Sequence, residues 1–374
     1  MFILREARMD DQCRLLELAR QLDSINLPTE SEEMADALER SRQSFAGTIK
    51  DRAEAAYMFC AELAGTDRLV GASMIIAKRG TSQLPHFSLD LINEERYSQA
   101  LQKTFQYTSL KLRQSVDGPS EVGGLIVDPS FRGHHQRVGR QISWVRFLYM
   151  GTHLDRFEKL VIAEIMPPLT PGYGNVFWTH YGGRLTGLTF REAVRLSIRD
   201  KEFIRALFPT TPLYICLLEE RVRASIAAVG YESRGAVRML EQAGMRFLDQ
   251  IDPLDGGPYF GCETATLEPV KAVQVLKLVP GDPKTQGPEY LIGLEDSKEF
   301  RAAMARAIVR DDQVAVDERT MKILGAKENT RVVITPLPSP EKRNSEESTS
   351  NVNHQHHFSQ SRSPDGNRKT AATG

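Results

Sequence analysis

Residues suited to chemistry gather in one basic, glycine-rich segment that links an apolar run to an amphipathic one. Residues 124–127 are typical of a buried strand, and Asp128-Pro129 ends it because proline lacks the N–H that a sheet requires. The loop that follows carries cations and glycines: Arg132, Gly133, Arg137, Gly139 and Arg140. A helix is predicted next, because apolar residues recur at helical spacing: Ile142, Val145, Leu148 and Tyr149.

This order of strand, basic loop and helix start is suited to binding an anion. Free N–H groups at a helix N-terminus point outward, and the helix dipole favours negative charge there. The arginines add formal positive charge, so the segment predicts a ligand that carries phosphates. The alternative is a surface loop whose arginines are simply solvated, since short motifs of this kind are weak evidence alone.

Three carboxylates are candidates for binding a cation. Glu164 stands inside the apolar run 160–166, where a carboxylate should be paired or functional, as a general base or as a ligand for a cationic substrate. The alternative is a residue at a strand end that faces solvent. Asp252 and Asp255 flank a glycine-rich turn and are suited to receiving a guanidinium or ammonium group. They are equally suited to bonding their own backbone.

Composition excludes several classes of protein. The 374 residues include 48 Lys and Arg against 49 Asp and Glu, so no basic field favours nucleic acid. The four cysteines are widely spaced, which predicts neither a metal site nor a disulfide framework. Charge follows the first residues too soon for a signal peptide, and no apolar run approaches a membrane span. We therefore expect a cytoplasmic protein without membrane contact.

The composition changes towards the C-terminus, which predicts three parts. Residues 1–279 form the main domain, and a shift to Gly, Pro, Asp and Lys at 280–287 predicts a linker. A small β-rich module follows at 288–336 and should dock on the main domain, because it cannot bury a sizeable core alone. Residues 337–374 are rich in Ser, Asn, Lys and Glu, so a disordered tail is expected.

The central segment resembles the acyl-CoA-binding segment of the GCN5-related N-acetyltransferase fold, whose backbone amides hold the CoA pyrophosphate. Arg132-Gly133 fits the start of that motif, His134-His135 is an insertion, and Gly139 stands at its last glycine. Arg137 replaces the preceding glycine. The resemblance implies the α/β (α+β) class, with a mixed, mostly antiparallel sheet and flanking helices. It also implies that the strand at 160–166 splays from the preceding one to admit the pantetheine.

Motifs along residues 2–336 are similar to the arginine N-succinyltransferase family. They are Leu27-Pro28, Leu125-x-x-Asp128-Pro129-x-x-Arg132, Gly172-Tyr173 before Phe177-Trp178, Pro212-Leu213-Tyr214, Glu241-x-x-Gly244, Ile251-Asp252-x-x-Asp255-Gly256-Gly257-Pro258 and Arg331-Val332-Val333. The resemblance implies transfer of a succinyl group from the co-substrate succinyl-CoA to the α-amine of L-arginine, the first step of an arginine-degrading pathway. It also implies a homo-oligomer or a paralogous partner chain, and no metal.

The resemblance assigns roles to the candidate residues. The position of Leu125 contacts succinyl-CoA in the family. We assign cofactor binding to the central segment and acceptor binding to the carboxylates: Leu125, Val127, Arg132, Gly133, Gly139 and Arg140 for the former, Glu164, Asp252 and Asp255 for the latter. The acceptor amine stays open between arginine and a relative such as ornithine.

The chain departs from the family at its proton donor. The family has a histidine in a Val-His-Pro segment, and this chain reads Val229-Gly230-Tyr231 there. We therefore assign proton transfer to Tyr231 or Glu232; a phenol suits protonation of a thiolate better than the role of a base at neutral pH. The alternative is a protein of the same fold that binds CoA or arginine with an altered acceptor or without turnover.

Overall fold

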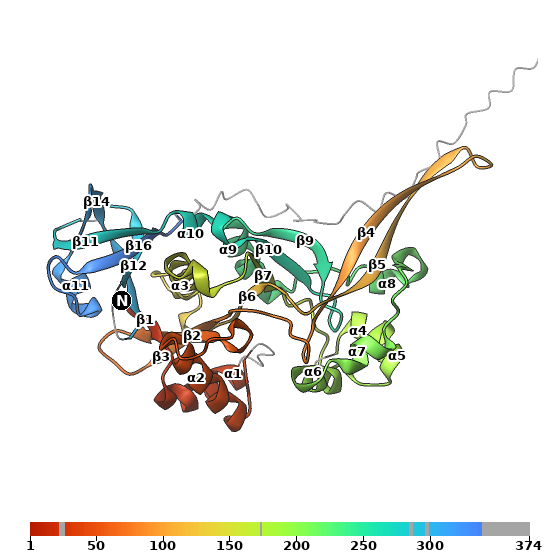
Figure 1. The fold of residues 1–374 in the computed structure, drawn as a ribbon, viewed down its shortest axis with the longest axis horizontal. Helices are drawn as coiled ribbons and strands as arrows, with labels where there is room; N and C mark the ends of the chain where they lie inside the picture. The colour runs from red at the N-terminus through yellow and green to blue at the C-terminus, as the bar shows by residue number, and fades with distance from the viewer. Residues whose placement is uncertain (22–26, 173, 284–286, 296–298, 339–374) are drawn as a thin grey trace, which may run out of the picture. The chain divides into compact units, whose positions relative to one another are not determined.

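One sheet of 16 strands organises the part of the chain that is described. The computed structural model describes residues 1–21, 27–172, 174–283, 287–295 and 299–338. The strand order is β14-β15-β11-β16-β12-β13-β1-β2-β3-β6-β7-β10-β9-β4-β5-β8. Within those residues the pairs are antiparallel except for β6 with β7 and β11 with β15. The predicted class, a mixed and mostly antiparallel sheet with flanking helices, is confirmed (Figure 1).

The strands have the following bounds: β1 Phe2–Glu6, β2 Ala56–Leu63, β3 Leu69–Ile76, β4 His86–Ser98, β5 Lys103–Ser115, β6 Ser120–Val127, β7 Leu160–Glu164, β8 Leu213–Tyr214, β9 Arg246–Ile251, β10 Pro258–Glu263, β11 Gln274–Pro280, β12 Glu289–Leu294, β13 Arg301–Arg306, β14 Ile308–Arg310, β15 Gln313–Val316 and β16 Arg331–Pro336. The α-helices are α1 Gln12–Gln21, α2 Ser31–Phe45, α3 Val138–Thr152, α4 Val176–His180, α5 Gly182–Thr186, α6 Phe190–Arg199, α7 Glu202–Leu207, α8 Glu220–Arg223, α9 Arg234–Gln242, α10 Glu268–Lys271 and α11 Glu318–Leu324.

The two faces of the central strands bury different helices. In β2, Tyr57 and Phe59 belong to the large core that includes α3, whereas Met58 and Cys60 pack with α1 and α2. Successive side chains of a strand point to opposite faces, so this alternation places α3 on one face and the two N-terminal helices on the other. The helix α3 is apolar nearly all round, which is why it is deeply buried.

A bulge in β6 changes which residues face α3. Gly124 has φ +58°, a left-handed conformation that glycine adopts without strain, and the register with β3 shifts there. Val122 faces α3 before the bulge, and Leu125 and Val127 pack against the same core after it. Ile126 packs with α1 and α2 instead. The bulge thereby turns both predicted cofactor-binding apolar residues towards the face that α3 covers.

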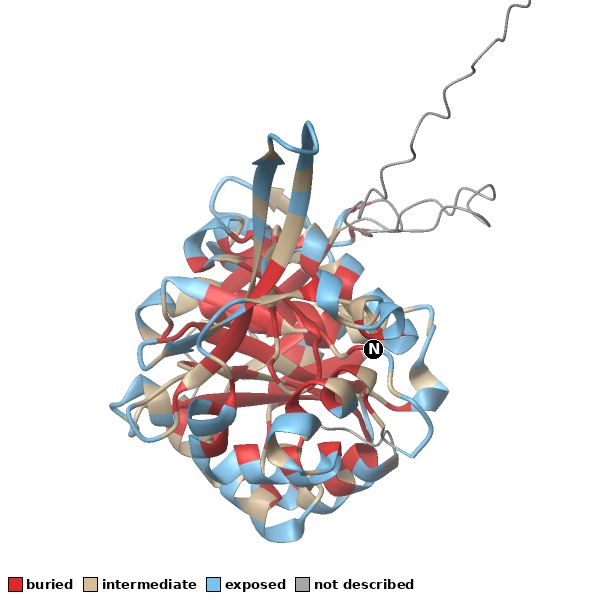
Figure 2. Ribbon diagram, turned by 90° about the vertical axis from the view of Figure 1, so that its right-hand side faces the viewer, coloured by how far each residue is buried: buried red, intermediate tan, exposed pale blue. Residues whose placement is uncertain are grey.

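A long hairpin extends the sheet on its other side. The strands β4 and β5 have 13 residues each and pair along their whole length, and only the base of β4 pairs with β9. The hairpin tip is exposed, whereas its base is buried (Figure 2). The hairpin spans residues 86–115. Its base packs in a second core with α4, α6, α7 and α8.

The C-terminal strands continue the same sheet. β13 pairs with β1, and β1 pairs with β2 on its other edge. Leu291, Ala302 and Val333 are buried in the same core as α3. The boundaries predicted at 279 and 288 stay predictions; residues 284–286 of the expected linker and residues 339–374 of the expected tail lie outside the described residues. No helix among the described residues is long and apolar enough to span a membrane.

Candidate functional site

The two parallel strands at the centre of the sheet part soon after they begin. β6 and β7 are paired only at Ser120 with Val161 and at Glu121 with Ile162. Beyond these pairs β6 continues to Val127 along β3, while β7 continues along β10. The strands therefore separate towards their C-terminal ends, as the resemblance to the acetyltransferase fold implies, and the backbone edge that each strand turns towards the other is left for a ligand.

The loop before α3 has the backbone of a glycine motif although Arg137 replaces the glycine. Arg137 adopts φ 51° and ψ 52°, the left-handed region in which a side chain costs roughly 1–2 kcal/mol. Its backbone N–H donates to the carbonyl of His134. The helix begins with Val138 and Gly139, and no described residue accepts from their backbone N–H groups. A Cβ built on Gly133 meets nothing within 4 Å. The loop therefore offers open space and free donors, which suits a phosphate.

The arginines of this loop already have protein partners. Arg132 pairs with Glu232 at 3.0 Å, and both side chains are exposed. Arg137 forms an ion pair with Glu289, and its Nη1 atom is buried without a hydrogen-bond partner among the described residues. Arg140 donates to the carbonyl of Pro338 at 2.6 Å. The orphaned Nη1 atom of Arg137 is a donor that a phosphate oxygen can satisfy.

The three predicted acceptor-binding carboxylates come together. Oxygens of Glu164, Asp252 and Asp255 lie within 4.8 Å of one another. β7 pairs with β10 so that Glu164 lies opposite Tyr259, whose hydroxyl donates to Asp252 at 2.9 Å. Asp252 also accepts from the backbone of Leu254, and Asp255 from that of Gly257 at 2.7 Å. The turn therefore bonds its own backbone, as one of the two alternatives predicts, and binding of a guanidinium or ammonium group stays a prediction.

Crowding makes this acidic cluster unfavourable when it is empty. Burial and the neighbouring charge of Asp252 raise the pKa of both Glu164 and Asp255 well above its ordinary value. Within the described residues, no cation lies within ion-pair distance of the three carboxylates, and the Glu164 carboxylate forms no hydrogen bond. A bound cation with several N–H donors would therefore relieve the repulsion.

Further polar side chains on the same face were missed from the sequence. Arg79 binds Glu121 in a two-pronged contact at 2.5 and 2.9 Å. Burial disfavours the charge of Glu121, but Arg79 holds its pKa below the usual value. His86, at the start of β4, stacks on Tyr259 with ring centroids 5.6 Å apart. Burial and the positive charge of Lys201 lower the pKa of His86 to about 4, so its ring is neutral at neutral pH.

The residues predicted for proton transfer lie beside the loop. Tyr231 and Glu232 belong to the short turn Tyr231–Ser233, and Tyr231 is 79% exposed with Arg234 over its ring. Glu232 is the partner of Arg132. Gly230 donates its N–H to the carbonyl of Met166 at 3.0 Å. The turn is therefore held against the chain that follows β7.

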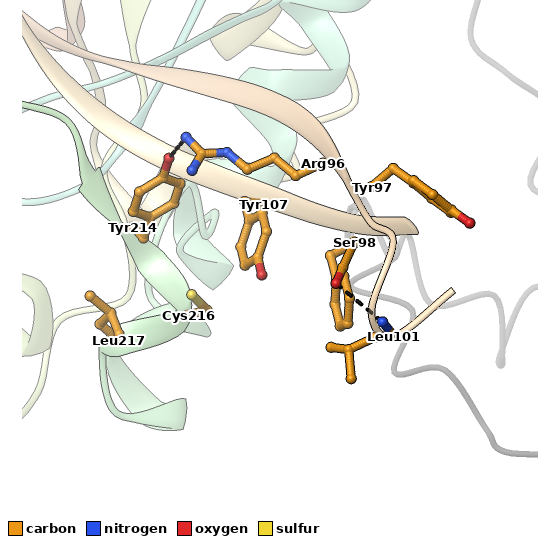
Figure 3. Close-up of a pocket in the computed structure, with 9 residues that line it drawn as sticks. Arg96, Tyr97, Ser98, Leu101, Tyr107, Tyr214, Cys216 and Leu217 are labelled. Carbon is orange, nitrogen blue, oxygen red and sulfur yellow. Dashed lines mark hydrogen bonds between the residues drawn. The ribbon is translucent and has the colours of Figure 1, made fainter. Parts of the chain in front are cut away.

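A separate hollow of about 530 Å³ lies on the β4–β5 hairpin (Figure 3). Tyr97, Leu101 and Tyr107 of the hairpin line it with Cys216 and Leu217, which follow β8. None of the residues predicted for catalysis or binding lines it. Because the hollow contains none of these residues, we take the strand gap and the acidic cluster as the candidate site.

The strand gap and the loop are suited to an anionic donor, and the acidic cluster is suited to a cationic acceptor. Comparison with known proteins identifies the family. Residues 2–269 match the family described as arginine N-succinyltransferase beta subunit, and residues 272–336 match its C-terminal domain. The chain belongs to the arginine N-succinyltransferase family.

Individual relatives are similar over almost their whole length. The arginine N-succinyltransferases of Enterobacter sp. (strain 638) and Citrobacter koseri are 25% and 26% identical, over 91% of this chain and 99% of each relative. The solved structure of arginine/ornithine succinyltransferase subunit AI from Pseudomonas aeruginosa has the same fold. It superposes with a TM-score of 0.78 at 24% identity and covers 91% of this chain and 99% of that one.

Replacing Glu164 with Gln should stabilise the empty protein in a pH-dependent way. Glu164 binds its proton more tightly in the folded chain, so the wild type loses stability as pH rises from the ordinary carboxyl pKa of about 4 towards the raised value. The melting temperature of Glu164→Gln relative to wild type should therefore be higher at pH 8 than at pH 5, by roughly 2–4 °C for each kcal/mol of relieved repulsion. The control is Asp67→Asn, which alters an exposed carboxylate. The difference in melting temperature between this variant and the wild type should be the same at pH 5 and at pH 8.

Replacing Gly230 should disturb the turn that it begins. A Cβ at this position lies 2.9 Å from the carbonyl oxygen of Met166 and 3.0 Å from that of Pro167. Both neighbours are backbone atoms, so Gly230→Ala and Gly230→His should each lower stability by about 1–3 kcal/mol in chemical denaturation. Gly235→Ala, whose Cβ meets nothing within 4 Å, is the matched control. Equal stability of all the variants would show that the turn yields freely.

Proposed function

We propose that this protein transfers the succinyl group of succinyl-CoA to the α-amine of L-arginine. The observation that carries the proposal is the acidic cluster of Glu164, Asp252 and Asp255, which lacks a paired cation among the described residues. A guanidinium group presents five N–H donors in a planar fork, which suits several carboxylates better than a compact ammonium does. Arginine is therefore favoured over ornithine as the acceptor.

The donor lies between β6 and β7 in this proposal. Leu125 and Val127 contact its pantetheine from the face that α3 covers. Gly133, Gly139 and the free N–H groups at the start of α3 receive the pyrophosphate, with Arg132 and Arg140 beside it. The close approach of Gly139 to Val127, where a Cβ would lie 3.6 Å from a methyl group, brings the helix start next to the strand gap. One ligand can thus contact both.

The reaction requires three proton movements besides the transfer of the acyl group. The α-ammonium group of arginine loses a proton, its nitrogen attacks the thioester carbonyl, a C–N bond forms and the C–S bond breaks. The new amide nitrogen releases a second proton, and the CoA thiolate takes one up. We assign acceptance of the second proton, which the new amide nitrogen releases, to the neutral ring of His86. No described residue forms a hydrogen bond with this ring. We assign protonation of the CoA thiolate to Tyr231 or Glu232.

Assembly and location stay proposals. The names of the matching family and of the Pseudomonas aeruginosa relative both contain the word subunit, which supports assembly with a second copy or with a related chain. We also propose that the protein acts in the cytoplasm. The absence of a metal remains a prediction, because three convergent carboxylates can also hold a divalent cation.

Purified protein should release free thiol only when succinyl-CoA and L-arginine are both present, and equally in the presence of EDTA. Glu164→Gln should raise the KM for arginine at least about tenfold, since a charged hydrogen bond is lost, and leave the KM for succinyl-CoA unchanged. Glu299→Gln, on the exposed partner of Arg8, is the control. Binding of succinyl-CoA without thiol release would favour a binding protein, a reading that the absence of a histidine at Gly230 also supports.

Substitutions at two positions, His86 and Tyr231, should locate the proton carriers. His86→Gln should lower kcat about 100-fold, the usual contribution of a general base, with little change in either KM. Imidazole in the buffer should partly restore His86→Ala. The control is His180→Gln, at a histidine of α4 that lies 3.8 Å from Glu219; this variant should keep the wild-type rate. Tyr231→Phe should slow turnover if the phenol protonates the thiolate; an unaltered rate removes Tyr231, and an unaltered His86→Gln removes His86.

A further inference from the structure

A buried arginine under the strand gap has no acidic partner. Arg146, in the third turn of α3, is 2% exposed. No carboxylate among the described residues lies within ion-pair distance of it. Burial lowers the pKa of its guanidinium to about 9. Because an isolated charge is costly inside a protein, buried charges are normally paired, and an exception needs an explanation.

The hydrogen bonds of Arg146 place it at the point where β6 and β7 part. Its Nη1 atom donates to the carbonyl of Gly123 at 3.3 Å, and Gly123 lies two residues beyond the last β6–β7 pair. Nε and Nη2 donate to the carbonyl and the hydroxyl of Ser143 at 3.0 and 2.7 Å. These three bonds use three of the five N–H groups of a guanidinium, so one N–H on each terminal nitrogen has no acceptor among the described residues.

The proposed donor substrate carries one anionic group besides its phosphates, the carboxylate of the succinyl group, and the loop does not bind it in our assignment. Its phosphates are assigned to the start of α3, and its succinyl end has a free carboxylate two methylene groups from the thioester carbonyl. Arg146 lies seven residues along α3 from Gly139, roughly 10 Å at 1.5 Å per residue. A single extended molecule can therefore place phosphates at one end of this stretch and its acyl group at the other, whereas one phosphate cannot serve both.

We propose that Arg146 binds the carboxylate of the succinyl group and so selects a dicarboxylic acyl donor over an uncharged one. This inference rests on the proposed function. The carboxylate supplies the missing counter-charge and accepts the two remaining N–H groups, while Ser143 and Gly123 hold the guanidinium in place. The other cations near the site are already engaged or lie towards the acceptor: Arg79 with Glu121, and Lys201 within the electrostatic influence of Asp252.

The test compares succinyl-CoA with butyryl-CoA, which has the same chain length and no terminal charge. Arg146→Met should lower kcat/KM for succinyl-CoA roughly 10- to 100-fold, the usual effect of losing a charged hydrogen bond, and leave the value for butyryl-CoA equal or higher. Arg146→Lys keeps the charge and should keep part of the preference. Replacing an unpaired buried charge with an apolar side chain of similar length is often tolerated, so the Met variant should fold.

The matched control is Arg156→Met. Arg156 donates to the hydroxyl of Tyr149 at 2.8 Å beyond the other end of α3, so its loss should not change the ratio between the two donors. An equal fall for both donors in Arg146→Met would show that the arginine only supports the bulge, and an unchanged ratio would overturn the proposal.

Binding measurements keep this inference separate from the proposed function. If the wild type releases no thiol, the proposed function fails, but calorimetry can still compare its affinities for succinyl-CoA and butyryl-CoA. A preference for succinyl-CoA that Arg146→Met abolishes would support the carboxylate site in a binding protein. Equal affinities in the wild type would overturn it.

Discussion

The early end of the pairing between β6 and β7 is the constraint on which the site depends. Parallel strands inside a sheet normally satisfy each other's backbone groups along their length. Here two residue pairs hold the strands together, and each strand then follows its outer neighbour. The bulge at Gly124 directs β6 along β3, and β10 holds β7. The opening therefore results from the antiparallel pairing of β6 with β3 and of β7 with β10, and α3 covers it on one side.

Charge is distributed unevenly around this opening. The loop and α3 contribute cations, of which Arg146 is buried without a counter-charge among the described residues, and the opposite face contributes three carboxylates that repel one another. Both features destabilise the protein when it is empty. An anionic donor and a cationic acceptor would offset both costs, so the folded chain is organised around partners that it does not itself supply.

The sequence predicts the segments of this site better than their spatial relations. The strand, basic loop and helix around Gly133 and Gly139 follow from local patterns, and so do the carboxylates. Asp252 and Asp255 share a turn, but Glu164 joins them through the pairing of β7 with β10, a long-range register that periodicity does not reveal. His86 comes from the base of a hairpin whose role no motif indicates. Arg146 was missed because its neighbours in α3 are apolar, so the helix reads as ordinary core.

The engaged arginines of the loop affect how a phosphate could be captured. Arg132 and Arg137 are each neutralised by a carboxylate, and Arg140 binds a carbonyl. An incoming phosphate would therefore meet a nearly balanced surface, and its binding would be a replacement of one anion by another. Such replacement gains little from long-range attraction, so association with the cofactor should depend only weakly on ionic strength. A phosphate that took the place of Glu232 beside Arg132 would release an exposed side chain into solvent, whereas Glu289 would keep its ion pair with Arg306. The mobility of Glu232 would therefore report whether the loop is occupied.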